Sequence, residues 1–265
     1  MSVALNSRVT GQGEPLIVLH GLFGSLENLG AVSQQLKQDY EIHGLDLRNH
    51  GGSPHTDSMD YPGMAADVIA YMDAQGLGQA HFLGHSMGGK VAMQLALSYP
   101  QRVARLIVAD ISPVTYPPHH NEVLEGLQAL DLHGVTSRKQ ADEALAPYVD
   151  TPGVRQFLLK NLVRLPADER EDDNLQFQWR LNVPVIVADY PKLARAPEGE
   201  GAFDGPVLFL KGANSAYIQT KHHEQINRLF PDAEIRVIED AGHWLHAEQT
   251  AEFVACCQAF LSRSL

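Results

Sequence analysis

The sequence predicts an α/β fold in which a mostly parallel, twisted sheet is flanked by helices and carries an inserted, mainly helical cap. Short apolar runs alternate with stretches of helical spacing up to residue 109, which is the pattern of parallel strands joined by crossover helices. The alternation stops after residue 111 and returns after residue 204. We therefore expect a core formed by residues 1–111 and 205–265, with the cap inserted at residues 112–204.

The first part of the core contains alternating predicted strands and helices. The strands are short runs of largely apolar residues, at 16–20, 41–45, 80–83 and 103–109. The helices lie between them, at 29–37, 61–75 and 89–99. The second helix has apolar residues at helical spacing and ends at Gly76, whereas the third is stopped by Pro100.

The same patterns predict the elements of the cap and of the last part of the core. Helical patches are predicted in the cap at 121–130, 137–148 and 154–165, while 183–188 fits either a helix or a strand. The acidic run 168–174 is expected to be a surface loop. After the cap, strands are predicted at 207–211 and 235–238, and helices at 220–230 and 248–261.

Composition excludes several classes of function. The 265 residues carry 32 acidic and 20 basic side chains, and the formal charge of −12 disfavours binding to nucleic acid or to anionic membranes. No apolar run approaches the roughly 20 residues that span a bilayer, and no signal peptide is visible at the N-terminus. The two cysteines, Cys256 and Cys257, are adjacent and poorly placed for a disulfide. We expect a cytoplasmic protein, as a monomer or a homodimer.

The segment Gly84-His85-Ser86-Met87-Gly88 fits the Gly-x-Ser-x-Gly pattern of a nucleophilic serine. It follows an apolar strand and opens a helix, which is the context that this motif requires. A sharp strand-to-helix turn leaves room only for small residues two positions before and after the serine. Ser86 is therefore the candidate nucleophile.

A serine hydroxyl needs a base, and His243 is the candidate among 13 histidines. It follows the last predicted strand, and loops beyond the carboxyl ends of parallel strands converge on one edge of the sheet. His246, in the same loop, is expected to have a packing or supporting role. The pairs 119–120 and 222–223 lack the spacing of a zinc site and are expected to be exposed or helix-capping.

With these motifs, the chain resembles the α/β-hydrolases over essentially its whole length. The segments 20–25 (HGLFGS), 48–51 (RNHG), 212–215 (GANS) and 242–248 (GHWLHAE) are similar to those of the bacterial YbfF-type esterases. That resemblance implies a soluble acyl-ester hydrolase related to eukaryotic mitochondrial hydrolases. The segment from Asp46 to Ser53 is more often architectural in this fold, so we assign it no catalytic role.

The acid of the triad departs from the usual pattern. Most α/β-hydrolases carry a carboxylate shortly after the strand predicted at 207–211, but Asn214 and Ser215 stand there. Either the triad is broken, or the acid comes from elsewhere. Asp110 ends the neighbouring strand at the same edge of the sheet, and the YbfF resemblance implies this shifted position. We expect Asp110 to be the acid, with Asp240 and Asp204 as weaker alternatives.

The remaining site residues follow from the chemistry of acyl transfer. The oxyanion that forms needs two backbone N–H donors, which we expect from Met87 and Leu22, with Phe23 as the alternative to Leu22. Aromatic side chains near the nucleophile and in the cap are candidates for an apolar substrate pocket, although for each cap residue core packing competes with that role. These are Phe23, Trp244, Tyr116, Trp179 and Tyr190.

We therefore predict a serine hydrolase of small-molecule carboxylic acyl esters that needs no metal or organic cofactor. The alternatives are an acyl-CoA thioesterase using the same triad and a low-turnover ligand-binding or receptor protein on the same fold. Only the missing carboxylate at 214–215 favours the receptor. Haloalkane dehalogenases and epoxide hydrolases are disfavoured, because they need a carboxylate where Ser86 stands.

Overall fold

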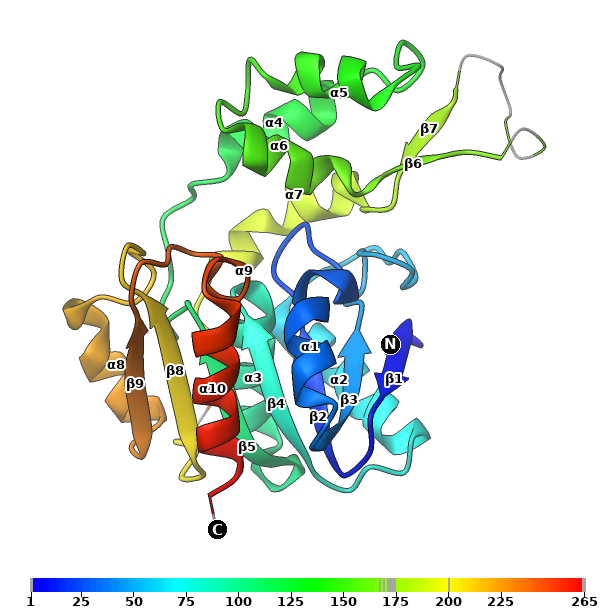
Figure 1. Cartoon of the computed structure of the whole chain (residues 1–265). Helices are drawn as coiled ribbons and strands as arrows, with labels where there is room; N and C mark the ends of the chain where they lie inside the picture. Colours follow the sequence, from blue (N-terminus) through cyan, green and yellow to red (C-terminus); the bar gives the residue numbers. More distant parts are fainter. Residues whose placement is uncertain (1, 167, 169, 171–174, 200, 264–265) are drawn as a thin grey trace.

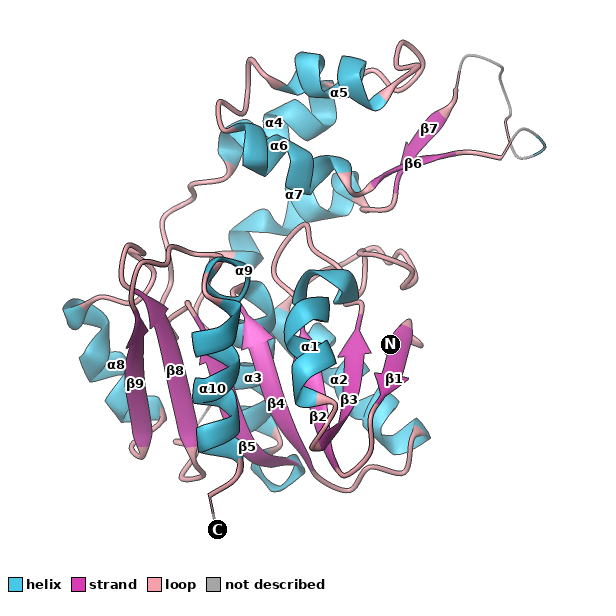
Figure 2. Ribbon diagram, viewed as in Figure 1, coloured by secondary structure: helices cyan, strands magenta, loops and turns pink. Residues whose placement is uncertain are grey.

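A seven-stranded, twisted sheet forms the centre of the core (Figures 1 and 2). The computed structural model describes residues 2–166, 168, 170, 175–199 and 201–263. The strand order is β1-β3-β2-β4-β5-β8-β9, and the pairs are parallel except for β1 with β3. The strands are β1 (Ser7–Thr10), β2 (Glu14–Leu19), β3 (Tyr40–Leu45), β4 (Ala80–His85), β5 (Val103–Ala109), β8 (Val207–Gly212) and β9 (Ala233–Ile238).

Helices cover both faces of the sheet (Figure 1). One face packs against α1 (Gly30–Leu36) and α10 (Thr250–Leu261), and the other against α2 (Tyr61–Ala74), α3 (Met87–Ser98) and α8 (His223–Leu229). Successive side chains of a strand point to opposite faces, so that Leu83 joins the first cluster and Phe82 the second. Burial on both faces explains why the strands read as continuous apolar runs.

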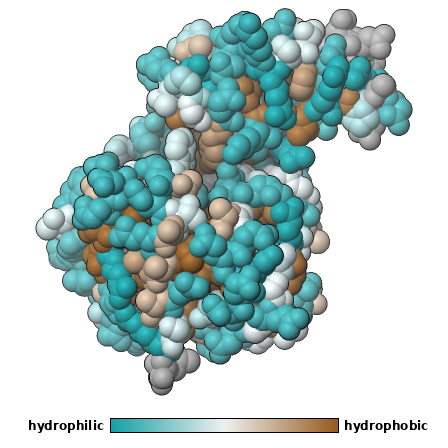
Figure 3. Space-filling view, in the orientation of Figure 1, coloured by the Kyte–Doolittle hydropathy of each residue, from teal (hydrophilic) through white to brown (hydrophobic). Residues whose placement is uncertain are grey.

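The cap elements lie beyond the carboxyl edge of the sheet (Figure 1). They are α4 (Asn121–Ala129), α5 (Arg138–Leu145), α6 (Pro152–Leu159), β6 (Leu162–Arg164), β7 (Phe177–Trp179) and α7 (Val183–Leu193). They enclose a small apolar cluster that includes Leu145, Leu159 and Phe177. Figure 3 shows apolar residues on the visible face of the cap, above the narrowing between cap and core. The cap boundaries at residues 112 and 204 stay a prediction.

The prediction of the fold class is confirmed, one predicted helix needs correction, and a few elements were left open or were not predicted. The helix predicted at 154–165 ends at Leu159, where the Asn161 side chain binds the carbonyl of Leu158, and the chain continues as β6. The ambiguous segment 183–188 is helical, with Pro184 in the first turn, where proline is tolerated. The last predicted helix, at 248–261, corresponds to α10, and a short helix that was not predicted, α9 (Leu245–Glu248), precedes it. Strand β1 was not predicted.

Two further observations concern sequence predictions about the surface and the membrane. The acidic run 168–174 lies outside the described residues, apart from Asp168 and Arg170. Within the part of the chain that the structure describes, no helix has the length and apolar character to cross a bilayer.

Candidate active site

Ser86 lies in a strained turn between β4 and α3. Its φ of 53° and ψ of −118° are rare for a residue with a side chain, and its N–H is held by the carbonyl of Ala109 at 2.9 Å. A Cβ on Gly84 would lie 2.3 Å from the Gly88 oxygen, and a Cβ on Gly88 would lie 2.4 Å from the Leu19 oxygen. Only glycine fits at either position, as the sequence argument required.

Three side chains from separate loops meet beside this turn. The Ser86 hydroxyl is 3.0 Å from Nε2 of His243, and Nδ1 of His243 is 2.7 Å from Oδ2 of Asp110. Because a carboxylate only accepts hydrogen bonds, the proton of neutral His243 belongs on Nδ1, which leaves Nε2 free to accept from Ser86. The side chain of Asp110 is fully buried, whereas that of His243 is 27% exposed.

The carboxylate of Asp110 is held by three donors. Oδ1 accepts the N–H of Gly212 at 3.1 Å, and Oδ2 accepts the Ser215 hydroxyl together with Nδ1 of His243. Asp110 itself has a φ of 51° at the end of β5. These donors solve the problem of burying a carboxylate, since a buried charge without hydrogen-bonding partners would be costly. Ser215 thus stands where most α/β-hydrolases carry the acid, and it donates to a carboxylate that follows the neighbouring strand.

The loop after β2 approaches Ser86 with its backbone. A Cβ on Gly21 would lie 3.3 Å from the Ser86 Cβ, so the two loops are in close contact at this point. Phe23 has a φ of 63°, and its N–H donates to Nε2 of His50 at 3.1 Å. That bond engages the N–H of Phe23, the alternative oxyanion donor. The N–H of Leu22 has no acceptor among the described residues. The N–H of Met87 is in the first turn of α3, where no preceding carbonyl binds it.

His50 is a buried support of this loop. Its Nδ1 donates to the carbonyl of Arg48 at 3.0 Å, which makes Nε2 the acceptor for Phe23. Burial lowers the pKa of His50 to about 3, so that the ring stays neutral and keeps this role. The architectural role expected for the segment from Asp46 to Ser53 agrees with these contacts.

Two more histidines pack beside His243. Nε2 of His85 donates to the carbonyl of His243 at 2.8 Å, and the His85 ring lies 4.4 Å from that of His246. Burial lowers the pKa of His246 to about 4 and that of His85 well below its ordinary value. Both rings are therefore uncharged near neutral pH and do not oppose a positive charge on His243.

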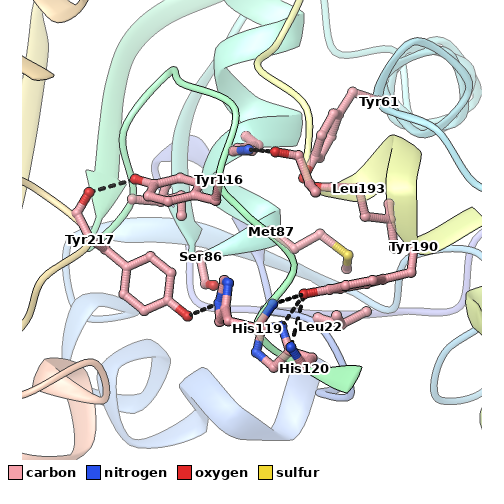
Figure 4. A pocket seen from close by; sticks show the side chains of 13 residues that line it. Leu22, Tyr61, Ser86, Met87, Tyr116, His119, His120, Tyr190, Leu193 and Tyr217 are labelled. Atoms are coloured by element: carbon pink, nitrogen blue, oxygen red, sulfur yellow. Dashed lines mark hydrogen bonds between the residues drawn. The ribbon is translucent and has the colours of Figure 1, made fainter. Parts of the chain in front are cut away.

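Two hollows open at Ser86. We call the smaller the inner cavity: it has a volume of about 50 Å³ and is lined by Met87, Lys90, Tyr61 and their neighbours (Figure 4). The larger, the outer groove, has a volume of about 640 Å³ and runs between the core loops and the cap helices α4 and α6. The predicted pocket residues divide between them: Tyr116 and Tyr190 line the inner cavity, and Phe23 and Trp244 line the outer groove.

Trp179 lines neither hollow. It lies in β7, within the cap, and packs against the apolar cluster that includes Leu162 and Phe177. The structure therefore places it in the packing role that competed with substrate contact in the sequence.

Three residues that the sequence did not single out as functional lie at the site. The Tyr217 ring stacks on His243, with centroids 4.1 Å apart and planes at 28°. The Tyr217 hydroxyl donates to Nε2 of His119 at 2.6 Å (Figure 4). The ring of His120 contacts the hydroxyl of Tyr190 at 2.8 Å. Burial lowers the pKa of His120 to about 4.

The expectation that the paired histidines are exposed or helix-capping agrees with His222, which is buried but whose Nδ1 accepts the N–H of Gln219 in a capping box. His120 stands at the N-cap position of α4 without a side-chain cap, and its ring contacts Tyr190 instead. The signal that could have pointed to His119 and Tyr217 was their position in the chain, because residues 119 and 217 follow the ends of β5 and β8. No group of three or more His, Cys, Asp or Glu side chains is arranged to hold a metal ion within the described ranges.

The chain is similar to known proteins over most of its length. The family model of the α/β hydrolase fold matches residues 14–250. The chain is 42% identical over 250 residues to the sn-1-specific diacylglycerol lipase ABHD11 of Xenopus laevis, which covers 91% of this chain and 78% of that protein. It is 37% identical over 249 residues to the esterase YbfF of Escherichia coli (strain K12), which covers 94% and 93%.

Among solved structures, a marine microorganism esterase superposes on this chain with a TM-score of 0.92 at 37% identity. The match covers 98% of this chain and 100% of the esterase. The resemblance seen in the sequence is thereby confirmed. The chain belongs to the α/β hydrolase fold family, in which it stands beside esterases and lipases.

Proposed function

We propose that the chain hydrolyses carboxylic esters through an acyl-enzyme, with Ser86 as nucleophile, His243 as general base and acid, and Asp110 as the orienting carboxylate. The observation that carries the proposal is the relay of 3.0 Å from Ser86 to His243 and 2.7 Å from His243 to Asp110. Like its esterase and lipase relatives, the chain is a carboxylic ester hydrolase. Its substrates are small-molecule esters.

In the first half of the reaction, Oγ of Ser86 attacks the ester carbonyl while its proton moves to Nε2 of His243. Negative charge collects on the former carbonyl oxygen, which accepts hydrogen bonds from the N–H groups of Leu22 and Met87. The bond to the alcohol oxygen then breaks, and Nε2 returns the proton to that oxygen. Asp110 holds Nδ1 throughout and stabilises the imidazolium that forms.

In the second half, a water molecule attacks the acyl carbon of the acyl-enzyme. Nε2 of His243 takes a proton from the water, and the same two N–H groups stabilise the new oxyanion. The bond to Oγ breaks, and Ser86 regains its proton from His243. One water is consumed, and one acid and one alcohol are released.

The test is hydrolysis of p-nitrophenyl esters with acyl chains from C2 to C16 by the wild type, Ser86→Ala and Asp110→Asn. Ser86→Ala should lower the rate to that of a protein without a nucleophile, and Asp110→Asn should lower kcat by about 10⁴-fold. Asp240→Asn is the matched control, because Asp240 also has a positive φ, 53° against 51°, but is exposed and contacts neither His243 nor Ser86 through its side chain.

Three outcomes decide between the alternatives. Full activity in Asp110→Asn would contradict the assignment of the acid. Wild-type turnover near background on every ester would contradict the esterase and favour the ligand-binding alternative. Faster hydrolysis of acyl-CoA thioesters than of oxygen esters of equal acyl length would favour the thioesterase.

A further inference from the structure

The two hollows at Ser86 differ in which parts of the catalytic machinery they contain. The inner cavity includes Met87 among its lining residues but not His243. The outer groove includes His243 and Gly21 but not Met87. Leu22 and Ser86 line both, so the reacting carbon of a bound ester would lie where the two hollows meet.

This asymmetry orients the ester. In the tetrahedral intermediate, the former carbonyl carbon carries four groups: Oγ of Ser86, the oxyanion, the leaving alcohol oxygen and the acyl chain. The leaving oxygen must lie within hydrogen-bonding distance of Nε2 of His243, which returns the proton. Because His243 lines only the outer groove, the alcohol extends into that groove, and the acyl chain extends past Met87 into the inner cavity.

The inner cavity is small, and two of the side chains that line it are hydrogen-bonded to the cap. The Tyr61 hydroxyl donates to the carbonyl of Leu193 at 2.5 Å, and Nζ of Lys90 donates to the carbonyls of Ala194 and Arg195 at 3.2 and 2.5 Å. Both side chains are buried, at 4% and 2% exposure. A longer acyl chain would have to break these hydrogen bonds to make room, since the present volume is about 50 Å³.

The outer groove has the opposite character. Its volume of about 640 Å³ is bordered by apolar side chains from both sides, among them Phe157 of the cap and Trp244 of the core, whose rings lie 5.6 Å apart. Val123 of α4 and Val154 of α6 extend the apolar surface. Charged residues, such as Glu27 and Lys160, also occur among its lining.

We infer, on the basis of the proposed function, that the substrate is an ester with a short acyl group and a larger, apolar alcohol. The acyl group occupies the inner cavity, and the alcohol lies in the outer groove. The residues that limit acyl length are Leu193, Tyr61 and Lys90, which line the inner cavity.

Isomeric esters test this orientation without changing the composition of the substrate. Hexyl acetate and ethyl hexanoate have the same atoms, but the long chain is on the alcohol in the first and on the acyl group in the second. The measurement is the ratio of their kcat/KM values, from titration of the released acid. We expect hexyl acetate to be favoured by about 10-fold or more, because each methylene that a pocket does not accommodate is worth about 10- to 200-fold.

Two variants should lower the ratio of kcat/KM for hexyl acetate to kcat/KM for ethyl hexanoate. One enlarges the inner cavity, and the other fills the outer groove. Leu193→Ala enlarges the inner cavity and should raise kcat/KM for ethyl hexanoate. Val154→Trp fills the outer groove and should lower kcat/KM for hexyl acetate. Leu145→Ala is the matched control for Leu193→Ala: it truncates the same side chain in the cap, but Leu145 is buried in the separate cap cluster and lines neither hollow, so the ratio should stay that of the wild type.

The outcomes separate this inference from the proposed function. A ratio near one, or in favour of ethyl hexanoate, in an enzyme that hydrolyses p-nitrophenyl acetate through Ser86 would overturn only the orientation. If the wild type hydrolysed none of the three esters, the proposed function would be overturned, and the orientation with it. An equal change of the ratio in Leu145→Ala and Leu193→Ala would contradict the assignment of Leu193 as a residue that limits acyl length.

Discussion

The hydroxyl of Ser215 donates a hydrogen bond to Oδ2 of Asp110, the same oxygen that faces Nδ1 of His243. Ser215 follows β8, where most members of this fold carry the acid, whereas Asp110 follows β5. The two strands are neighbours in the sheet, so their ends reach the histidine from adjacent directions. If Asp110 is the acid, as we propose, it lies one strand away from the usual position, where Ser215 donates to it.

This relationship predicts that the acid can be moved back. Asp110→Asn should lower kcat by about 10⁴-fold, and adding Ser215→Asp should restore part of that loss, because a carboxylate at 215 would lie beside the same imidazole nitrogen. Adding Asn214→Asp instead is the matched control and should restore nothing. The measurement is kcat on p-nitrophenyl acetate, and equal recovery in both double variants would contradict the prediction.

Tyr217 is predicted to position His243. Tyr217→Ala removes the ring that stacks on the imidazole and should lower kcat by about 10- to 100-fold, which is the cost of a misplacement on the scale of 1 Å. Tyr217→Phe keeps the ring and loses only the hydrogen bond to His119, so it should retain most of the activity. If Phe lowers kcat as much as Ala does, the hydroxyl and its contact with the cap matter more than the stacking.

His50 is predicted to act on the oxyanion site through Phe23. His50→Ala removes the acceptor that holds the Phe23 N–H and should lower kcat by about 10-fold with little change in KM, less than the 10²–10³-fold loss on deleting an oxyanion donor itself. His50→Gln offers an oxygen acceptor in its place and should recover part of the activity. A parallel rise in KM would indicate general unfolding of the loop instead.

Lys90 is predicted to make stability depend on pH. Burial lowers its pKa from 10.5 to about 7, so between these values the unfolded chain binds more protons than the folded one. The free energy of unfolding should therefore rise with pH from about 7 towards 10, by up to about 1.4 kcal/mol per pH unit, relative to Lys90→Met. Urea unfolding of both proteins at pH 7, 8 and 9 measures the difference. A difference that stays constant with pH would contradict the prediction.

The predictable parts of the site were those encoded in short segments. The turn at Ser86 follows from two glycines and the order of strand and helix, and the position of His243 follows from the last strand. The structure brings Asp110 to the place that the sequence argument expected, although its role in catalysis stays a prediction. His119 and Tyr217, by contrast, meet across a sequence separation of 98 residues, and nothing in either local sequence indicates the other.

The strands that the sequence did not predict were missed for a different reason. Strand β1 consists of four residues, three of them exposed, at the edge of the sheet, so it lacks the apolar pattern that marks the central strands. Strands β6 and β7 have three residues each and are defined by pairing with each other. Such short elements depend on tertiary contacts, which periodicity in a single sequence does not report.

The backbone at Ser86 has a consequence for any attempt to make this protein more resistant to heat. With a φ of 53° and a ψ of −118°, the residue occupies a region that glycine tolerates far better, at a cost on the order of 1–3 kcal/mol for a residue with a side chain. A Ser86→Gly chain should thus melt at a higher temperature than its parent while having lost its nucleophile. A library sorted for thermal tolerance alone would enrich inactive molecules at this codon, so every round of sorting must also demand turnover.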